Sequence, residues 1–135
     1  MRYLPQLFAN NRAWAAQRIG QNPQFFTRLC AIQSPRYLWI GCADSRVPAN
    51  EIVGLDPGEL FVHRNVANIV RADDFNCLAV LQYAIEFLGI TDIIICGHYG
   101  CGGVQAALGS LVPEPLERWI SPIREIRRSQ AAAID

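Results

Sequence analysis

Two short segments of this chain carry thiols, an imidazole and a carboxylate where apolar runs end. They are residues 42–46 (CADSR) and residues 98–101 (HYGC). If the two runs are parallel strands that lie side by side, their carboxyl ends bring Cys42, His98 and Cys101 to one crevice. Protein ligands of the Cys, His and Cys type leave one position of a tetrahedral zinc ion open, as in catalytic zinc sites. The segments therefore predict a zinc site that is catalytic rather than structural.

Asp44 and Arg46 add a charged pair beside the first thiol. Asp44 lies two residues after Cys42, where an extended backbone returns its side chain to the same face. The pair can simply order the loop, or Arg46 can orient Asp44 as a carboxylate next to the open zinc position. In the second interpretation Asp44 either accepts a hydrogen bond from the reacting hydroxide or becomes the fourth zinc ligand. These two uses exclude each other, so the pair can act as a switch.

The other cysteines and histidine carry less specific expectations. Cys30, Cys77 and Cys96 stand among apolar neighbours, so we expect them to be buried as small hydrophobic residues. His63 ends a further apolar run, which fits either a structural role behind the site or a direct role in proton transfer. Residues 97–103 are rich in glycine but lack the spacing of a phosphate-binding loop. Close backbone approach around a metal explains these glycines better.

The composition is that of a folded domain and excludes several functions. At 135 residues, with 51% hydrophobic and 18% charged residues, the chain predicts one globular domain. Twelve basic residues balance twelve acidic ones, which predicts no nucleic-acid partner, and the absence of lysine excludes Schiff-base chemistry and a P-loop lysine. No apolar run approaches the roughly 18 residues of a membrane span. Five cysteines without an export signal predict free thiols or metal ligands in a cytoplasmic protein that does not contact a membrane.

The apolar patterning predicts an α/β fold in which helices flank a mostly parallel sheet of three strands in the order 2-1-3. We expect one domain, with an N-terminal helical arm over residues 1–34 and a zinc-binding core over residues 35–135. Asn22-Pro23 predicts the start of the second helix, and Pro122 predicts an interruption of the last one. The last residues end in mid-pattern, so we expect a fragment of a longer protein. The expected helices cover residues 3–20, 22–33, 48–54, 73–88, 102–108 and 114 onward, and the expected strands cover residues 36–41, 59–63 and 91–97.

Three segments together resemble the β-class carbonic anhydrases. They are GCADSRV (41–47), HRNVAN (63–68) and ICGHYGCGG (95–103), and the similarity extends over most of the chain. The resemblance implies reversible hydration of carbon dioxide to bicarbonate and a proton, with Asp44 orienting the attacking hydroxide. It also implies that the zinc ligands are Cys42, His98 and Cys101, and that the catalytic pair is Asp44 and Arg46.

The resemblance further implies a substrate pocket and an assembly. Members of the family form dimers or tetramers with the active site at the subunit interface, so Gln33 would reach the pocket of another subunit. Trp39 and Arg64 resemble the subgroup in which bicarbonate binds a second, non-catalytic pocket and favours the closed state, with Asp44 on zinc. The positions that match the substrate pocket are Gln33, Val66, Tyr83, Leu88 and Gly102.

Three other functions compete with carbonic anhydrase activity. Carbon disulfide and carbonyl sulfide hydrolases resemble the β class and use the same zinc ligands on other linear substrates, so release of sulfide would identify them. A catalytically inert zinc-binding fragment would hold the metal without turnover. A nucleotide-binding α/β domain is disfavoured because the chain has no phosphate-binding motif.

Overall fold

The computed structural model describes residues 4–131, and these fall into two compact units that divide between Ser34 and Pro35. The first unit holds helices α1 (Leu4–Gln21) and α2 (Phe25–Ala31). Its side chains meet in an aromatic cluster, in which the ring of Trp14 lies 6.2 Å from that of Phe25 and 5.7 Å from that of Phe26. The first predicted helix is confirmed over the described residues.

The start of α2 differs from the sequence-based expectation. Asn22 is expected to cap this helix, but the helix begins only at Phe25 and ends at Ala31, two residues before Gln33. The side-chain oxygen of Asn22 instead accepts a hydrogen bond from the backbone amide of Gln24 at 3.0 Å. Asparagine side chains commonly close such local turns, and here the turn delays the helix.

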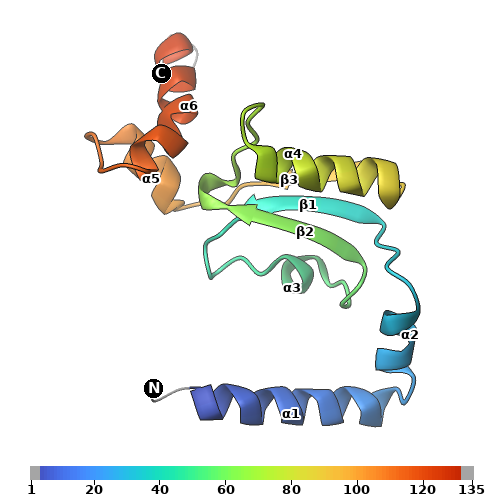
Figure 1. Ribbon diagram of the computed structural model, residues 1–135. Coiled ribbons are helices and arrows are strands. Elements are labelled where there is room, and N and C mark those ends of the chain that lie inside the picture. Colours follow the sequence, from blue (N-terminus) through green and yellow to red (C-terminus); the bar gives the residue numbers. More distant parts are fainter. Residues whose placement is uncertain (1–3, 132–135) are drawn as a thin grey trace. The chain divides into compact units, whose positions relative to one another are not determined.

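The second unit is built on a parallel sheet of strands β1 (Tyr37–Cys42), β2 (Leu60–Asn65) and β3 (Asp92–Cys96), shown in Figure 1. The strand order is β2-β1-β3, and both pairings of β1 are parallel, so the predicted fold is confirmed. Gly41 of β1 is in register with Arg64 of β2 and with Cys96 of β3. The three strands therefore end level with one another, which gathers the segments that follow them.

Helices cover the two faces of this sheet, as side-chain alternation along β1 requires. Leu38 and Ile40 are fully buried in a cluster that includes residues of α4 (Phe75–Gln82). Trp39 points the other way and clusters with the first residue of α3 (Ala49–Val53). In Figure 1, α4 and α3 accordingly lie on opposite sides of the strands.

The helix expected over residues 73–88 begins and ends close to the predicted positions. The side chain of Asp74 accepts a hydrogen bond from the amide of Asn76 at 3.1 Å and caps α4. After Gln82 the chain continues in a π-helical segment, η2 (Tyr83–Phe87), which sequence patterning does not reveal. Gly89 follows with a φ of 66°, the left-handed conformation that favours glycine after a helix end.

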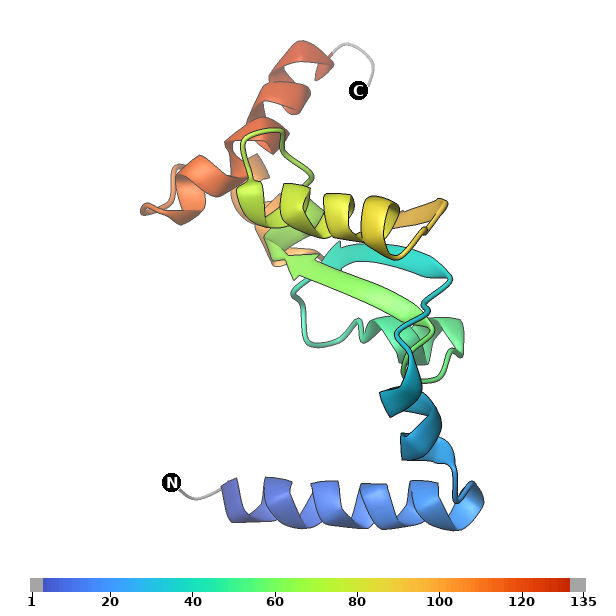
Figure 2. The same ribbon diagram turned by 45° about the vertical axis from the view of Figure 1, so that its right-hand side comes forward.

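The chain closes with α5 (Gly102–Leu108) and α6 (Leu116–Ser129), which lie beyond the carboxyl ends of β1 and β2 (Figure 2). The expectation that Pro122 interrupts the last helix is wrong, because α6 runs through it. Proline has no amide hydrogen for the carbonyl of Arg118, four residues earlier. Nη1 of Arg71 at 2.8 Å and Oγ of Ser121 at 2.9 Å donate to that carbonyl instead.

Arg124 of α6 holds the end of α5. Its guanidinium donates to the carbonyls of Ala107 and Gly109, both at 2.7 Å, and of Ala106 at 3.0 Å. Nε of Arg124 also lies 2.8 Å from Oε1 of Glu117. A cation therefore sits where the last carbonyls of α5 have no helical partner.

None of the helices in the described part of the chain is long and apolar enough to cross a membrane.

Candidate metal centre

Three metal-ligating side chains meet at the carboxyl ends of β1 and β3. Cys42 is the last residue of β1, His98 follows the end of β3, and Cys101 directly precedes α5. The sulfur atoms of the two cysteines are 3.8 Å apart. The two sulfurs and one ring nitrogen of His98 all lie within 4.8 Å of one another. The parallel arrangement of the strands thus brings together groups that are more than fifty residues apart in sequence.

His98 is oriented for coordination. Its Nδ1 lies 3.0 Å from the carbonyl oxygen of Tyr99, to which a neutral ring donates its hydrogen. Nε2 then carries the lone pair, as in metal-binding histidines. Nε2 is also buried and has no hydrogen-bond partner among the described residues. An unpartnered buried nitrogen beside two thiols fits a cation, and two sulfurs with one nitrogen are a ligand set suited to zinc.

The electrostatics of the cluster favour the thiolate that a metal requires. Burial by itself would raise the pKa of Cys42, but the amide of Asp44, His98, the amide of Ala67 and Cys101 lie close to its sulfur and together lower the pKa to about 7. The nearby sulfur of Cys42 raises the pKa of His98, with smaller contributions from the Tyr99 carbonyl and from Asp44. Cys42 and His98 thus stabilise each other's charged forms.

Asp44 and Arg46 form a two-pronged ion pair at the edge of this cluster. Nε of Arg46 lies 2.9 Å from Oδ1 of Asp44, and Nη2 lies 2.6 Å from Oδ2. These hydrogen bonds hold the pKa of Asp44 well below its usual range. Oδ2 of Asp44 is also 3.8 Å from Nε2 of His98. Nη2 of Arg46 donates to the carbonyl of Gly100 at 3.2 Å, which ties the first segment to the second.

Arg64 supports the same loop through its backbone. Its Nε donates to the carbonyl of Cys42 at 2.7 Å, and its Nη2 donates to the carbonyl of Asp44. Sequence reasoning misses this contact, since only the register of Arg64 with Gly41 places the guanidinium beside the loop. Trp39 is 4% exposed and packs on the α3 side of the sheet. Their assignment to a bicarbonate site stays a prediction.

Gly103 allows a close approach behind the cluster. A Cβ atom at this position would lie 2.8 Å from Cγ1 of Val66 and 2.9 Å from Cβ of Ala67. Val66 and Ala67 belong to the 3-10 turn η1 (Val66–Asn68), and Ala67 packs with Cys42 and Cys101. Close packing against Val66 and Ala67 therefore requires glycine at position 103, and the expected close approach to a metal stays a prediction.

The residues expected to line the substrate pocket are not gathered at this cluster by the chain alone. Val66 and Gly102 neighbour it through η1 and the start of α5. The ring of Tyr83 stacks on that of Phe87, and its centre lies 5.8 Å from the centre of the Phe61 ring. Phe61 is in register with Leu38, so Tyr83 lies near the amino end of β1 and away from the cluster. Leu88 packs against the same core cluster. Gln33 belongs to the first unit.

The remaining cysteines correct one expectation and confirm another. All five cysteines are free thiols. Cys77 is buried, as expected, whereas Cys30 is exposed and Cys96 is half-buried, so the expectation that all three are buried is wrong. Cys30 lies on a helix that buries none of its residues, and Cys96 lies on β3, which pairs on one side only. Apolar neighbours in sequence do not reveal such exposure.

Comparisons with known proteins agree with this geometry. Residues 37–135 match the family described as carbonic anhydrase. A carbonic anhydrase of Emericella nidulans is 51% identical over 99% of this chain, and one of Candida albicans is 41% identical over 96%. The chain spans 60% of the first protein's length and 47% of the second's.

Solved structures give the same result. A chain from the tetrameric β-carbonic anhydrases of Sordaria macrospora superposes with a TM-score of 0.95 at 41% identity, covering 98% of this chain and 68% of that one. A β-carbonic anhydrase of Aspergillus fumigatus gives a TM-score of 0.92 at 40% identity, covering 96% of this chain and 62% of that one. The chain belongs to the carbonic anhydrase family, in its β class.

Proposed function

We propose that the protein catalyses the reversible hydration of carbon dioxide to bicarbonate and a proton, with zinc held by Cys42, His98 and Cys101. The observation that carries this proposal is the convergence of three ligand atoms within 4.8 Å around the unpartnered Nε2 of His98. A zinc ion bound there would supply a Lewis acid that makes a water molecule more acidic. Family membership supports the same reaction.

In this proposal Asp44 orients the attacking water. Because Arg46 keeps Asp44 ionised, its carboxylate can accept a hydrogen bond but cannot donate one. Its Oδ2 atom lies beside Nε2 of His98, at 3.8 Å. A water molecule that donates to Oδ2 would turn an oxygen lone pair toward carbon dioxide. Hydration forms a bond between that oxygen and carbon and breaks one O–H bond, whose proton passes to solvent.

We further propose that Asp44 also has a closed position in which it is the fourth zinc ligand. Moving there requires Asp44 to leave at least one of its two hydrogen bonds with the Arg46 side chain. Arg64 opposes larger movements, since it holds the carbonyls of Cys42 and Asp44. The pairing of Asp44 with Arg46 is therefore the contact that would separate an open site from a closed one.

We also propose that the protein is a cytoplasmic homo-oligomer, a dimer or a tetramer. Relatives from Sordaria macrospora are tetrameric, and β3 is an edge strand with Ile95 58% exposed. In such an assembly Gln33, Tyr83 and Leu88 from another subunit would complete a pocket for carbon dioxide. The five free thiols are consistent with a reducing compartment.

Stopped-flow hydration of carbon dioxide, with zinc measured in the same sample, tests the proposal. We expect turnover with zinc bound at this cluster, and we expect Cys42→Ser to lose turnover together with about one zinc per chain. Cys30→Ser is the matched control, because this cysteine lies outside the cluster and should leave the zinc content unchanged. Zinc without turnover would indicate an inert site, and sulfide release from carbon disulfide without carbon dioxide hydration would indicate a different hydrolase. Either result would overturn the proposed reaction.

A further inference from the structure

A second group of metal-ligating side chains lies in the core unit and shares no residue with the first. His63 stands on β2, Asp74 caps α4, and Cys77 lies in the first turn of α4. One ligand atom from each of these residues lies within 4.8 Å of the other two. His63 is 7% exposed and Cys77 is fully buried, whereas Asp74 is half-buried.

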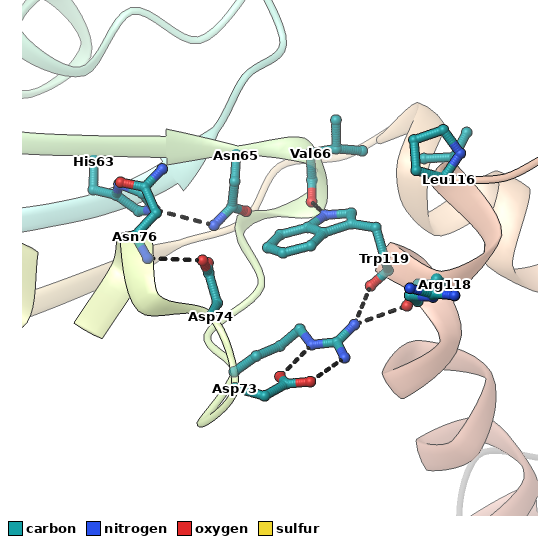
Figure 3. Close-up of a pocket in the computed structure, with 11 residues that line it drawn as sticks. His63, Asn65, Val66, Asp73, Asp74, Asn76, Leu116, Arg118 and Trp119 are labelled. Atoms are coloured by element: carbon teal, nitrogen blue, oxygen red, sulfur yellow. Dashed lines mark hydrogen bonds and ion pairs between the residues drawn. The ribbon is translucent and has the colours of Figure 1, made fainter. Parts of the chain in front are cut away.

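Two of the three residues border a cavity of about 660 Å³, shown in Figure 3. His63 and Asp74 line the cavity, and Trp119 of α6 lines it as well. Trp119 is held in place because its indole nitrogen donates to the carbonyl of Val66 at 2.7 Å. The cavity gives a hydrated ion a route to ligands that are otherwise buried, which a real metal site requires.

We propose that His63, Asp74 and Cys77 form a second binding site for a divalent cation of the zinc type, entered from this cavity. One nitrogen, one oxygen and one sulfur ligand are all among the ligands that zinc accepts, and cobalt and cadmium bind similar sets. The cation would lie where the three side chains face one another. The cavity would leave a further position for water.

The charges of the group agree with this assignment. When a cation binds, the S–H bond of Cys77 breaks, a bond between sulfur and the metal forms, and the proton passes to solvent. One thiolate and one carboxylate then balance a divalent charge, so no unpaired charge stays buried.

The ligand atoms are only weakly engaged in other contacts. Oδ1 of Asp74 accepts the capping hydrogen bond from Asn76, which leaves Oδ2 without a hydrogen bond among the described residues. Nε2 of His63 lies 3.4 Å from the side-chain nitrogen of Asn65, a long and therefore weak contact. Binding a cation would therefore displace little existing structure.

Cadmium binding by a chain without the first two thiols tests the site apart from any activity. In Cys42→Ala/Cys101→Ala, equilibrium dialysis should still detect about one cadmium per chain. Adding Asp74→Asn should weaken cadmium binding more than about tenfold. Residues that only hydrogen-bond to a metal ligand already contribute tenfold or more to metal affinity, and Asp74 would be a ligand itself. Asparagine caps helices as well as aspartate does, so the start of α4 should survive, which circular dichroism can check. Asp73→Asn is the matched control, because Asp73 pairs with Arg71 outside the group.

Cobalt gives a second measurement on the same background. A near-ultraviolet sulfur-to-cobalt absorption band should appear, and it should disappear when Cys77→Ala is added. The inference is overturned if the double variant binds no cadmium, or if Asp74→Asn and Asp73→Asn bind it equally. It is also overturned if the cobalt band survives Cys77→Ala.

Discussion

Replacing Arg124 with alanine should separate α5 from α6 and lower the stability of the protein substantially. The Arg124 side chain is 15% exposed, and among its acceptors the carbonyls of Ala106 and Ala107 and the carboxylate of Glu117 are part-buried. The carbonyls of Gly109 and Ser110 are exposed, so water can replace the arginine there. Counting about 1 kcal/mol for each of the three part-buried contacts gives a loss of about 3 kcal/mol.

Urea denaturation followed by circular dichroism measures this loss, and a thermal melt should show a drop of about 10 °C. Arg127→Ala is the matched control, because within residues 4–131 Arg127 makes a single exposed hydrogen bond, to the carbonyl of Leu108 at 2.8 Å. That variant should lose less than about 1 kcal/mol. If the two variants lose equal stability, the reasoning that Arg124 holds the end of α5 is refuted.

Three further predictions concern the site and its support. Asp44→Asn, which removes the charge that Arg46 holds, should lower kcat/KM for carbon dioxide hydration about 100-fold with unchanged zinc content; a loss of zinc would contradict the orienting role. Gly103→Ala should lower the free energy of unfolding by about 1–3 kcal/mol, because the added Cβ would collide with Val66 and Ala67. Gly102→Ala should be nearly neutral, because a Cβ at that position would meet nothing within 4 Å beyond its own stretch of chain. The amide of Val112, and then Arg124, hold the pKa of Glu117 below its usual 4.5. The ionised carboxylate therefore stabilises the fold above pH 4.5, and this stabilisation is lost as the pH falls through the lowered pKa. Glu117→Gln should therefore be less stable than the unchanged chain in urea at neutral pH, and the gap should close in strong acid; a gap independent of pH would show that the charge is irrelevant.

The sheet could be predicted from the sequence because each strand is a short apolar run followed by polar or metal-ligating residues. The runs at Tyr37–Cys42 and Asp92–Cys96 are confirmed as neighbouring parallel strands. The end of the second strand, at Asn65 rather than His63, could not be read from apolar residues because Arg64 and Asn65 are polar. Backbone pairing with β1 extends the strand to them.

Contacts between residues far apart in sequence account for several of the other differences. Helix α6 continues through Pro122 because Arg71 donates a hydrogen bond to the carbonyl of Arg118, which lies 47 residues away in sequence. The contact of Arg64 with the loop carbonyls depends on strand register. Tyr83 and Leu88 lie toward the amino end of β1, and a motif match cannot show which end of the sheet, or which subunit, a matched residue serves.

X-ray absorption at the zinc edge tests the central claim most directly, on the chain loaded with one equivalent of zinc. If Cys42, His98 and Cys101 hold the ion, the spectrum should contain two sulfur neighbours at about 2.3 Å together with nitrogen or oxygen neighbours at about 2.0–2.1 Å. A spectrum with only nitrogen and oxygen neighbours would contradict the assignment of this cluster as the zinc site.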